Sequence, residues 1–172
     1  MLKPQDIVVL LKLVVAEPGW TFWQIANELE MSPSAVHRSL ERADRAGLYQ
    51  PARKKVRQDA LLEFLSHGGK YVFPPALQGE ARGFPTAWAA PPLANRLSSS
   101  RENIPVWPHA LGKARGIALS PIHPMVPKAA LKTPPLGEML TLFDAIRIGK
   151  AREQEMAIEE LGMRLGAKAA SP

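Results

Sequence analysis

Proline is unevenly distributed in this sequence, and 12 of the 17 prolines lie within residues 73–135. The proline ring fixes the backbone angle φ and removes an amide donor, so a stretch rich in proline is poor in regular structure. The regions on either side have helical patterns of apolar residues instead. We therefore predict a mainly α fold in three parts: a compact helical head at residues 1–72, an extended, irregular Pro-rich arm at 73–135 and a long helix at 136–172.

The predicted arm carries large apolar residues between its prolines, among them Phe84, Trp88 and Trp107. A linker that serves only for reach would be poorer in aromatic residues. Because tryptophan buries a large area, this composition indicates an extended segment that lies against an apolar surface. That surface is either the helical core of the same chain or a partner protein, and the sequence favours neither.

The predicted C-terminal helix has a wide apolar stripe that needs a partner surface. The head, a second copy of the chain and another protein are the candidates. The stripe consists of Leu136, Met139, Leu140, Phe143 and Ile146. Gly149 follows it and marks a place where the helix can kink or break. A charged cluster that we expect on the surface, either as a solvated, self-paired face or as an edge that docks a partner, consists of Asp144, Arg147, Arg152 and Glu153.

The absence of cysteine excludes disulfides, thiolate catalysis and cysteine-based zinc sites, and it is typical of a reducing compartment. The longest apolar run, residues 7–16, is interrupted by Lys12. That run is much shorter than the roughly 20 residues that a membrane-spanning helix needs. We therefore expect a cytoplasmic protein with no membrane contact.

Two short helices are predicted at the start of the head from their start and stop signals. Pro4 suits an early helical position, and the Pro18-Gly19 pair ends the first helix. Thr21 with Gln24 three residues later matches a capping box, in which each side chain bonds the other residue's backbone. The second helix is expected to begin there and to end near Glu30.

The third predicted helix, residues 32–46, follows after a tight turn, with Ser32 as its N-cap and Pro33 at its first position. Its outward side is polar and mostly not acidic, and consists of Ser34, His37, Arg38, Glu41 and Arg45. A short turn between two helices, with Ser, His and Arg near the start of the second, is typical of a helix-turn-helix that reads DNA. A three-helix core whose third helix binds nothing is the alternative interpretation.

The run TFWQIANELEMSPSAVHRSLERADRAGLYQ, residues 21–50, resembles the helix-turn-helix of MarR-like winged-helix transcription regulators of bacteria. The matching positions are Thr21, Ile25, Ala26, Leu29, Met31, Ser32, Ser34, Val36, Arg38, Leu40, Gly47 and Leu48. Ala43 stands where that family has leucine. The resemblance covers less than a third of the chain. It implies a winged-helix-like head in which Ser32, Ser34, His37 and Arg38 contact DNA.

The sequence departs from that family directly after the predicted reading helix. Apolar residues from Val56 to Leu65 have helical spacing, and His67-Gly68-Gly69 ends the pattern, so the wing is expected to be short or absent. The segment PARKKVR, residues 51–57, is expected to form a basic loop. The segment KYVFPP, residues 70–75, is a candidate strand to pair with the segment that begins at Leu48.

Basic residues are concentrated beside the predicted reading helix, with six between Arg42 and Arg57 against only Asp44. Such a patch attracts a polyanion at long range, although a basic face without a ligand has the same composition. We predict that Ser34, His37 and Arg38 reach base edges in the major groove of double-stranded DNA. The residues expected to hold phosphates are Thr21, Ser32, Arg42, Arg45, Arg53, Lys54, Lys55 and Arg57.

No catalytic pattern stands out in the chain. The four histidines, His37, His67, His109 and His123, are scattered, and no two have the spacing of paired zinc ligands. A glycine-rich phosphate loop and paired carboxylates are also missing from the sequence. We therefore expect neither an enzyme nor a metal or cofactor site.

Together these patterns predict a sequence-specific DNA-binding transcriptional regulator that forms a homodimer through its C-terminal helix. The alternative is an antitoxin-like or adaptor subunit that binds a co-encoded partner protein through residues 73–166 and uses the head for autoregulatory DNA binding. A ligand-responsive repressor is a third hypothesis, and it would need a pocket between the head and the rest of the chain.

Overall fold

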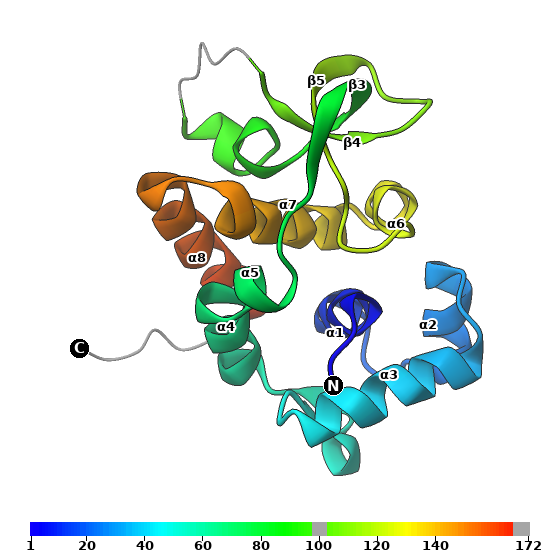
Figure 1. Cartoon of the computed structure of the whole chain (residues 1–172). Helices are drawn as coiled ribbons and strands as arrows, with labels where there is room; N and C mark the ends of the chain where they lie inside the picture. The colour runs from blue at the N-terminus through cyan, green and yellow to red at the C-terminus, as the bar shows by residue number, and fades with distance from the viewer. Residues whose placement is uncertain (98–102, 167–172) are drawn as a thin grey trace.

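The computed structural model describes residues 1–97 and 103–166, and the end of the predicted C-terminal helix, residues 167–172, lies outside the described residues (Figure 1). The helices are α1 (Pro4–Val15), α2 (Phe22–Leu29), α3 (Pro33–Arg45), α4 (Gln58–His67), α5 (Gly69–Val72), α6 (Val126–Lys132), α7 (Pro134–Ile148) and α8 (Ala151–Leu165). The strands are β1 (Tyr49–Gln50), β2 (Lys55–Val56), β3 (Leu77–Pro85), β4 (Pro105–Pro108) and β5 (Ala114–Leu119).

The prediction of a mainly α, winged-helix-like fold with an irregular arm is wrong, because the chain is a mixture of helices and two small sheets. Strands β1 and β2 form an antiparallel hairpin, and β3, β4 and β5 close into a three-stranded barrel. Strand β3 is antiparallel to both neighbours, whereas β4 and β5 are parallel. Pro85 and Pro105 stand at strand ends, where a missing amide donor is tolerated. Proline-rich composition therefore did not prevent strand formation here.

Two glycines let the strands of the barrel approach one another closely. A Cβ atom at Gly83 would lie 1.9 Å from the carbonyl oxygen of Trp107, and one at Gly116 would lie 2.0 Å from that of Ile104. Any larger residue at either position would push the strands apart. Since a barrel of only three strands has little interior, these two contacts define how tightly it closes.

Helix α7 is the centre of the molecule, and Figure 1 shows it between the barrel and the N-terminal helices. It packs against α1, α4, α5, α6 and α8 and against the short helical turn at residues 87–89 that follows β3. The predicted apolar stripe from Leu136 to Ile146 is buried within this one chain. The head helices, α6, α8 and the turn at residues 87–89 therefore supply the partner surface that the stripe needs, and the stripe offers no surface to a second copy.

The expected exposed charged cluster is largely buried, which corrects the sequence interpretation. Asp144 and Arg147 are buried under the barrel side of α7, and Glu153 is buried on α8. The Asp144 carboxylate accepts hydrogen bonds of 2.7 Å from Thr86 Oγ1 and from Trp107 Nε1, and it pairs with Arg147 at 2.8 Å. These bonds attach the barrel to α7, a long-range relationship that helical periodicity does not contain.

The C-terminal region that we predicted as one long helix consists of two helices, α7 and α8. The break between them falls at Gly149, where the sequence indicated that the helix can kink or break. Gly149 has extended backbone angles, and a Cβ there would lie 2.3 Å from the carbonyl oxygen of Ala145. The break lets α8 fold back on α7 and reach α4. No helix within the described ranges has the length and apolar character needed to cross a membrane.

The helix starts predicted for the head are confirmed. The Thr21 hydroxyl accepts a hydrogen bond from the Gln24 backbone amide at 3.1 Å, and the Ser32 hydroxyl accepts one from that of Ala35 at 3.1 Å. The capping box at Thr21 is only half formed, because the Gln24 side chain donates to Glu28 instead. These local bonds fix where α2 and α3 begin.

The strand that begins after Leu48 pairs with residues 55–56, and the proposed pairing with KYVFPP is wrong. Tyr49 faces Val56 and Gln50 faces Lys55 in the hairpin. Residues 69–72 form α5 instead and pack on α7. The basic segment at residues 51–57 thus forms the tip and second strand of a hairpin.

Candidate nucleic-acid interface

Helix α3 lies along an outer edge of the molecule, at the opposite end from the barrel (Figure 1). Its inner side, Val36, Ser39, Leu40 and Ala43, is buried, and α3 packs against α1, α2 and β1. The outer side consists of Ser34, His37, Arg38, Glu41 and Arg45, all of them exposed. The described part of the Pro-rich region, residues 73–97 and 103–135, leaves this face exposed, so a long ligand can reach it.

The hydroxyl groups at the start of α2 and α3 are exposed but already used as caps. Ser32 Oγ lies 3.1 Å from Ser34 Oγ in addition to accepting from the Ala35 amide. Thr21 Oγ1 accepts from the Gln24 amide. A hydroxyl that accepts from a helix amide keeps its own proton for donation. Thr21 can therefore still donate to an anion, and Ser32 can do so when Ser34 is the donor in the bond between the two serines.

His37 and Arg38 differ in how firmly they are held. The His37 ring contacts the Phe22 ring at a centroid distance of 5.6 Å, and its Nδ1 lies 3.8 Å from a carboxylate oxygen of Glu41. Arg38 has no ion pair with any carboxylate in the described part of the chain. The Arg38 guanidinium is thus free to bind a ligand, and its planar fork matches the paired acceptors on the edge of guanine.

Arg42 does not face outward, which corrects its assignment as a phosphate contact. Its side chain donates two hydrogen bonds to the buried carboxylate of Asp6 on α1, at 2.8 and 2.7 Å, and a third to Ser39 Oγ at 3.2 Å. Hydrogen bonding to Asp6 raises the pKa of Arg42. The residue therefore ties α3 to α1, and its guanidinium is engaged within the chain.

The other predicted cations lie on and beside the β1–β2 hairpin. Arg53, Lys54, Lys55 and Arg57 are exposed. Lys54 adopts left-handed backbone angles at the hairpin tip, with φ of 51°, and its Nζ lies 5.6 Å from the centroid of the Trp20 ring. Among the described residues, no carboxylate forms an ion pair with any of these four. The hairpin is thus a compact source of positive charge.

The hairpin and α3 adjoin one another across a small cavity. This cavity, of about 180 Å³, is lined by residues of α2, α3 and the hairpin that include His37, Tyr49 and Lys54. Glu41 and Asp44 also line it, so the groove between the two elements is mixed in charge. The structure therefore places the predicted base-reading residues and the predicted phosphate-holding hairpin on adjoining elements of the head.

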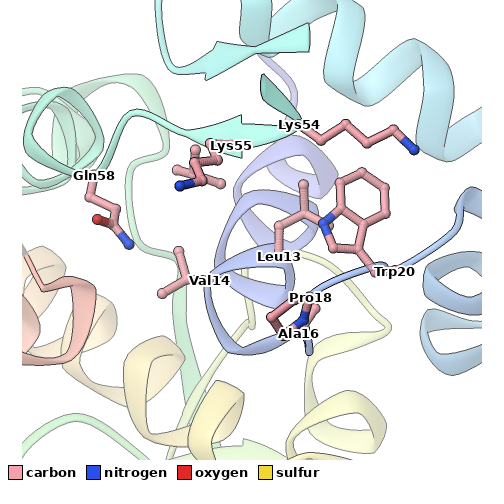
Figure 2. Close-up of a pocket in the computed structure, with 9 residues that line it drawn as sticks. Leu13, Val14, Ala16, Pro18, Trp20, Lys54, Lys55 and Gln58 are labelled. Atoms are coloured by element: carbon pink, nitrogen blue, oxygen red, sulfur yellow. The ribbon is translucent and has the colours of Figure 1, made fainter. Parts of the chain in front are cut away.

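A second cavity, of about 270 Å³, lies between the end of α1 and the hairpin (Figure 2). Leu13, Val14 and Trp20 form its apolar part, and Lys54 and Lys55 border it (Figure 2). A third cavity, of about 260 Å³, lies where the head meets the rest of the chain and has Pro4, Phe73, Ile122 and Arg147 in its lining. This third cavity lies between the head and the rest of the chain, the place where a ligand-responsive repressor would hold its ligand.

No known protein family, curated protein or solved structure matches this chain. In the part of the chain that the structure describes, no three His, Asp or Glu side chains gather as a metal site.

Trp23 is a candidate contact residue that we did not identify from the sequence. It lies in the first turn of α2 and is 70% exposed. Glu28 of the same helix pairs with Lys12, so that side of α2 faces α1. At 100° per residue, Trp23 lies on a different side from Glu28 and away from the buried face of α2. A tryptophan at an outward helical position was the signal in the sequence.

Proposed function

We propose that this chain is a sequence-specific, DNA-binding transcriptional regulator whose α3 enters the major groove. The observation that carries the proposal is the uncovered outer face of α3, where Ser34, His37 and Arg38 are exposed near the start of the helix. Residues near the N-terminus of a reading helix are those that contact base edges in helix-turn-helix proteins. The resemblance of residues 21–50 to the MarR-like regulators supports the same assignment.

In this proposal, Arg38, His37 and Ser34 contact the base edges. The Arg38 guanidinium forms two parallel hydrogen bonds to O6 and N7 of one guanine, and the shorter His37 and Ser34 side chains contact neighbouring bases. Since Arg38 lacks a carboxylate partner among the described residues, it need not break an ion pair to bind.

Exposed groups around α3 bind the phosphates in this proposal. These are Thr21, Ser32, Arg45, Arg53, Lys54, Lys55 and Arg57. Trp23, beside Thr21 at the start of α2, packs against the sugar–phosphate backbone where α2 crosses it. Arg42 is removed from this set because Asp6 holds it.

We also propose that the regulator works in the cytoplasm as a homodimer, so that two copies of α3 read half-sites about one DNA turn apart. Because α7 is covered within its own chain, the dimer must use a surface other than the stripe from Leu136 to Ile146.

The test is selection from a random duplex library at physiological salt with the full chain. We expect one sequence to be enriched, and a palindrome would indicate a two-fold dimer. Arg38→Ala should then cost ~1–3 kcal/mol on the enriched duplex and relax its preference at one position. Arg152→Ala, at an exposed arginine on α8, is the matched control and should bind as the unmodified chain does. The proposal fails if nothing is enriched, or if Arg38→Ala weakens specific and random duplexes equally.

A further inference from the structure

The barrel carries a cationic surface far from α3 that the proposed function does not use. We define the barrel patch as Arg82, Leu111, Lys113 and Arg115. Arg82 on β3 and Arg115 on β5 are direct cross-strand partners, and both are exposed. Lys113 is exposed directly before the start of β5, two residues from Arg115. Figure 1 shows the barrel at the opposite end of the molecule from α3.

The two arginines are incompletely neutralised within the chain. Arg115 approaches Glu80 at 3.8 Å, with both side chains about two-thirds exposed. For Arg82 and Lys113, no carboxylate of the described residues lies within ion-pair distance. Like charges directly opposite each other on neighbouring strands are destabilising. A surface that keeps such a pair is explained more simply by an anionic partner than by the stability of the barrel.

Next to this pair, an apolar side chain is held exposed on a rigid turn. Leu111 is 70% exposed. Its amide donates to His109 Nδ1 at 3.1 Å, and the His109 amide donates to the Arg82 carbonyl at 3.2 Å. The His109 ring also lies against the Phe84 ring, with centroids 4.9 Å apart.

The same turn is clamped at Gly112, where a Cβ would lie 2.3 Å from the Cα of Gly83. The backbone of this turn is therefore packed closely on β3, and the Leu111 side chain is not part of the core. A phosphate group gains no favourable contact from an exposed leucine. Protein interfaces, by contrast, combine an apolar anchor with arginines and a polar rim.

We infer that the barrel patch docks an acidic amphipathic segment of a partner protein. Carboxylates of that segment pair with Arg82, Arg115 and Lys113, and an apolar side chain packs on Leu111. This inference is independent of DNA binding by α3. Because the two surfaces lie at opposite ends of the molecule, a protein bound to the barrel leaves α3 free, and the chain would hold a partner near its DNA site.

The experiment selects peptides from a random displayed library on the immobilised full chain, in the absence of DNA. We expect the enriched peptides to combine several Asp or Glu residues with a large apolar residue. One enriched peptide, synthesised with a fluorescent label, is then titrated with the chain and its variants. Circular dichroism of each variant verifies folding, and no loss of fold is expected because the substituted side chains are exposed.

Arg82→Ala with Arg115→Ala should weaken peptide binding about tenfold or more, and Leu111→Ser should weaken it by about fivefold, as expected for interface anchors. The matched controls are Arg152→Ala, an exposed arginine on α8, and Met163→Ser, an exposed apolar residue on the same helix. Both controls should leave the affinity unchanged.

The inference is overturned if no peptide is enriched, if the enriched peptides are neutral or basic, or if the barrel variants bind as well as the controls. A single-stranded oligonucleotide of random sequence is tested in parallel. If it loses affinity with the double arginine variant and the acidic peptides do not compete with it, the patch binds nucleic acid and the inference is wrong.

Discussion

Arg42 on α3 donates two hydrogen bonds to the carboxylate of Asp6 on α1, and Asp6 is completely buried. The Asp6 carboxylate also accepts the Lys3 backbone amide at 2.8 Å, so one side chain caps α1 and anchors α3. This pair joins α3 to α1 beside the apolar contacts that α3 makes with the head. The position of the outer residues of α3 therefore depends in part on the buried bond between Arg42 and Asp6.

Replacing Arg42 by leucine should destabilise the chain by about 3 kcal/mol, because it leaves the buried Asp6 carboxylate without its counter-charge. Denaturant unfolding measures the change. Adding Asp6→Leu to the same chain should restore part of the loss, since the unpaired charge is then removed. An Arg42→Leu chain as stable as the unmodified one would show that the pair contributes nothing.

Gly83→Ala should destabilise the chain by about 3 kcal/mol or more, because its Cβ would lie 1.9 Å from the Trp107 carbonyl oxygen. Gly79 on the same strand provides the control, since a Cβ there has no atom within 4 Å. Gly79→Ala should change stability by less than about 1 kcal/mol. Equal effects of the two substitutions, measured by thermal and denaturant unfolding, would contradict the close approach of β3 and β4.

Glu160 on α8 makes stability depend on acid pH. Burial by itself raises the pKa of Glu160, but hydrogen bonds from Arg164 and Arg96 outweigh it and hold the pKa below the ordinary value of 4.5. Because the folded pKa is lowered, the stabilisation is fully present above pH 4.5 and is lost as the pH falls through the folded pKa.

Glu160→Gln should therefore cost about 1 kcal/mol at neutral pH and progressively less below the ordinary glutamate pKa. Unfolding curves collected across the acid range measure this difference. Glu159→Gln is the control. Glu159 also lies near Arg96, at 3.6 Å, but its side chain is 61% exposed. A Glu160→Gln effect that does not shrink in acid would refute the assigned ion pairs.

Lys54→Ala should weaken binding to specific and random duplexes alike and reduce the slope of log affinity against log salt by ~1, as expected for a lost phosphate contact. The control is Lys70→Ala, because Lys70 also lies over an aromatic ring, that of Tyr71, but on α5. Fluorescence anisotropy over a series of salt concentrations measures both. A Lys54→Ala effect confined to one duplex sequence would exclude a phosphate role.

Local signals in the sequence determined where the head helices begin and which way they face. Thr21 and Ser32 bond amides only three residues away, so neither cap depends on the rest of the chain. The spacing of Val36, Leu40 and Ala43 likewise determined which side of α3 is exposed, and hence most of the candidate interface. The weak point at Gly149 is local too, and α7 ends there.

Tertiary structure alone decided the barrel, the burial of Asp144 and the partner of Arg42. Thr86 and Trp107 reach Asp144 from positions 58 and 37 residues away, and Asp6 lies 36 residues from Arg42. In the sequence, the charged residues among them stand at positions where surface exposure is expected. They become buried and paired only when the chain closes long loops and another element covers them, and helical or strand periodicity carries no record of that closure.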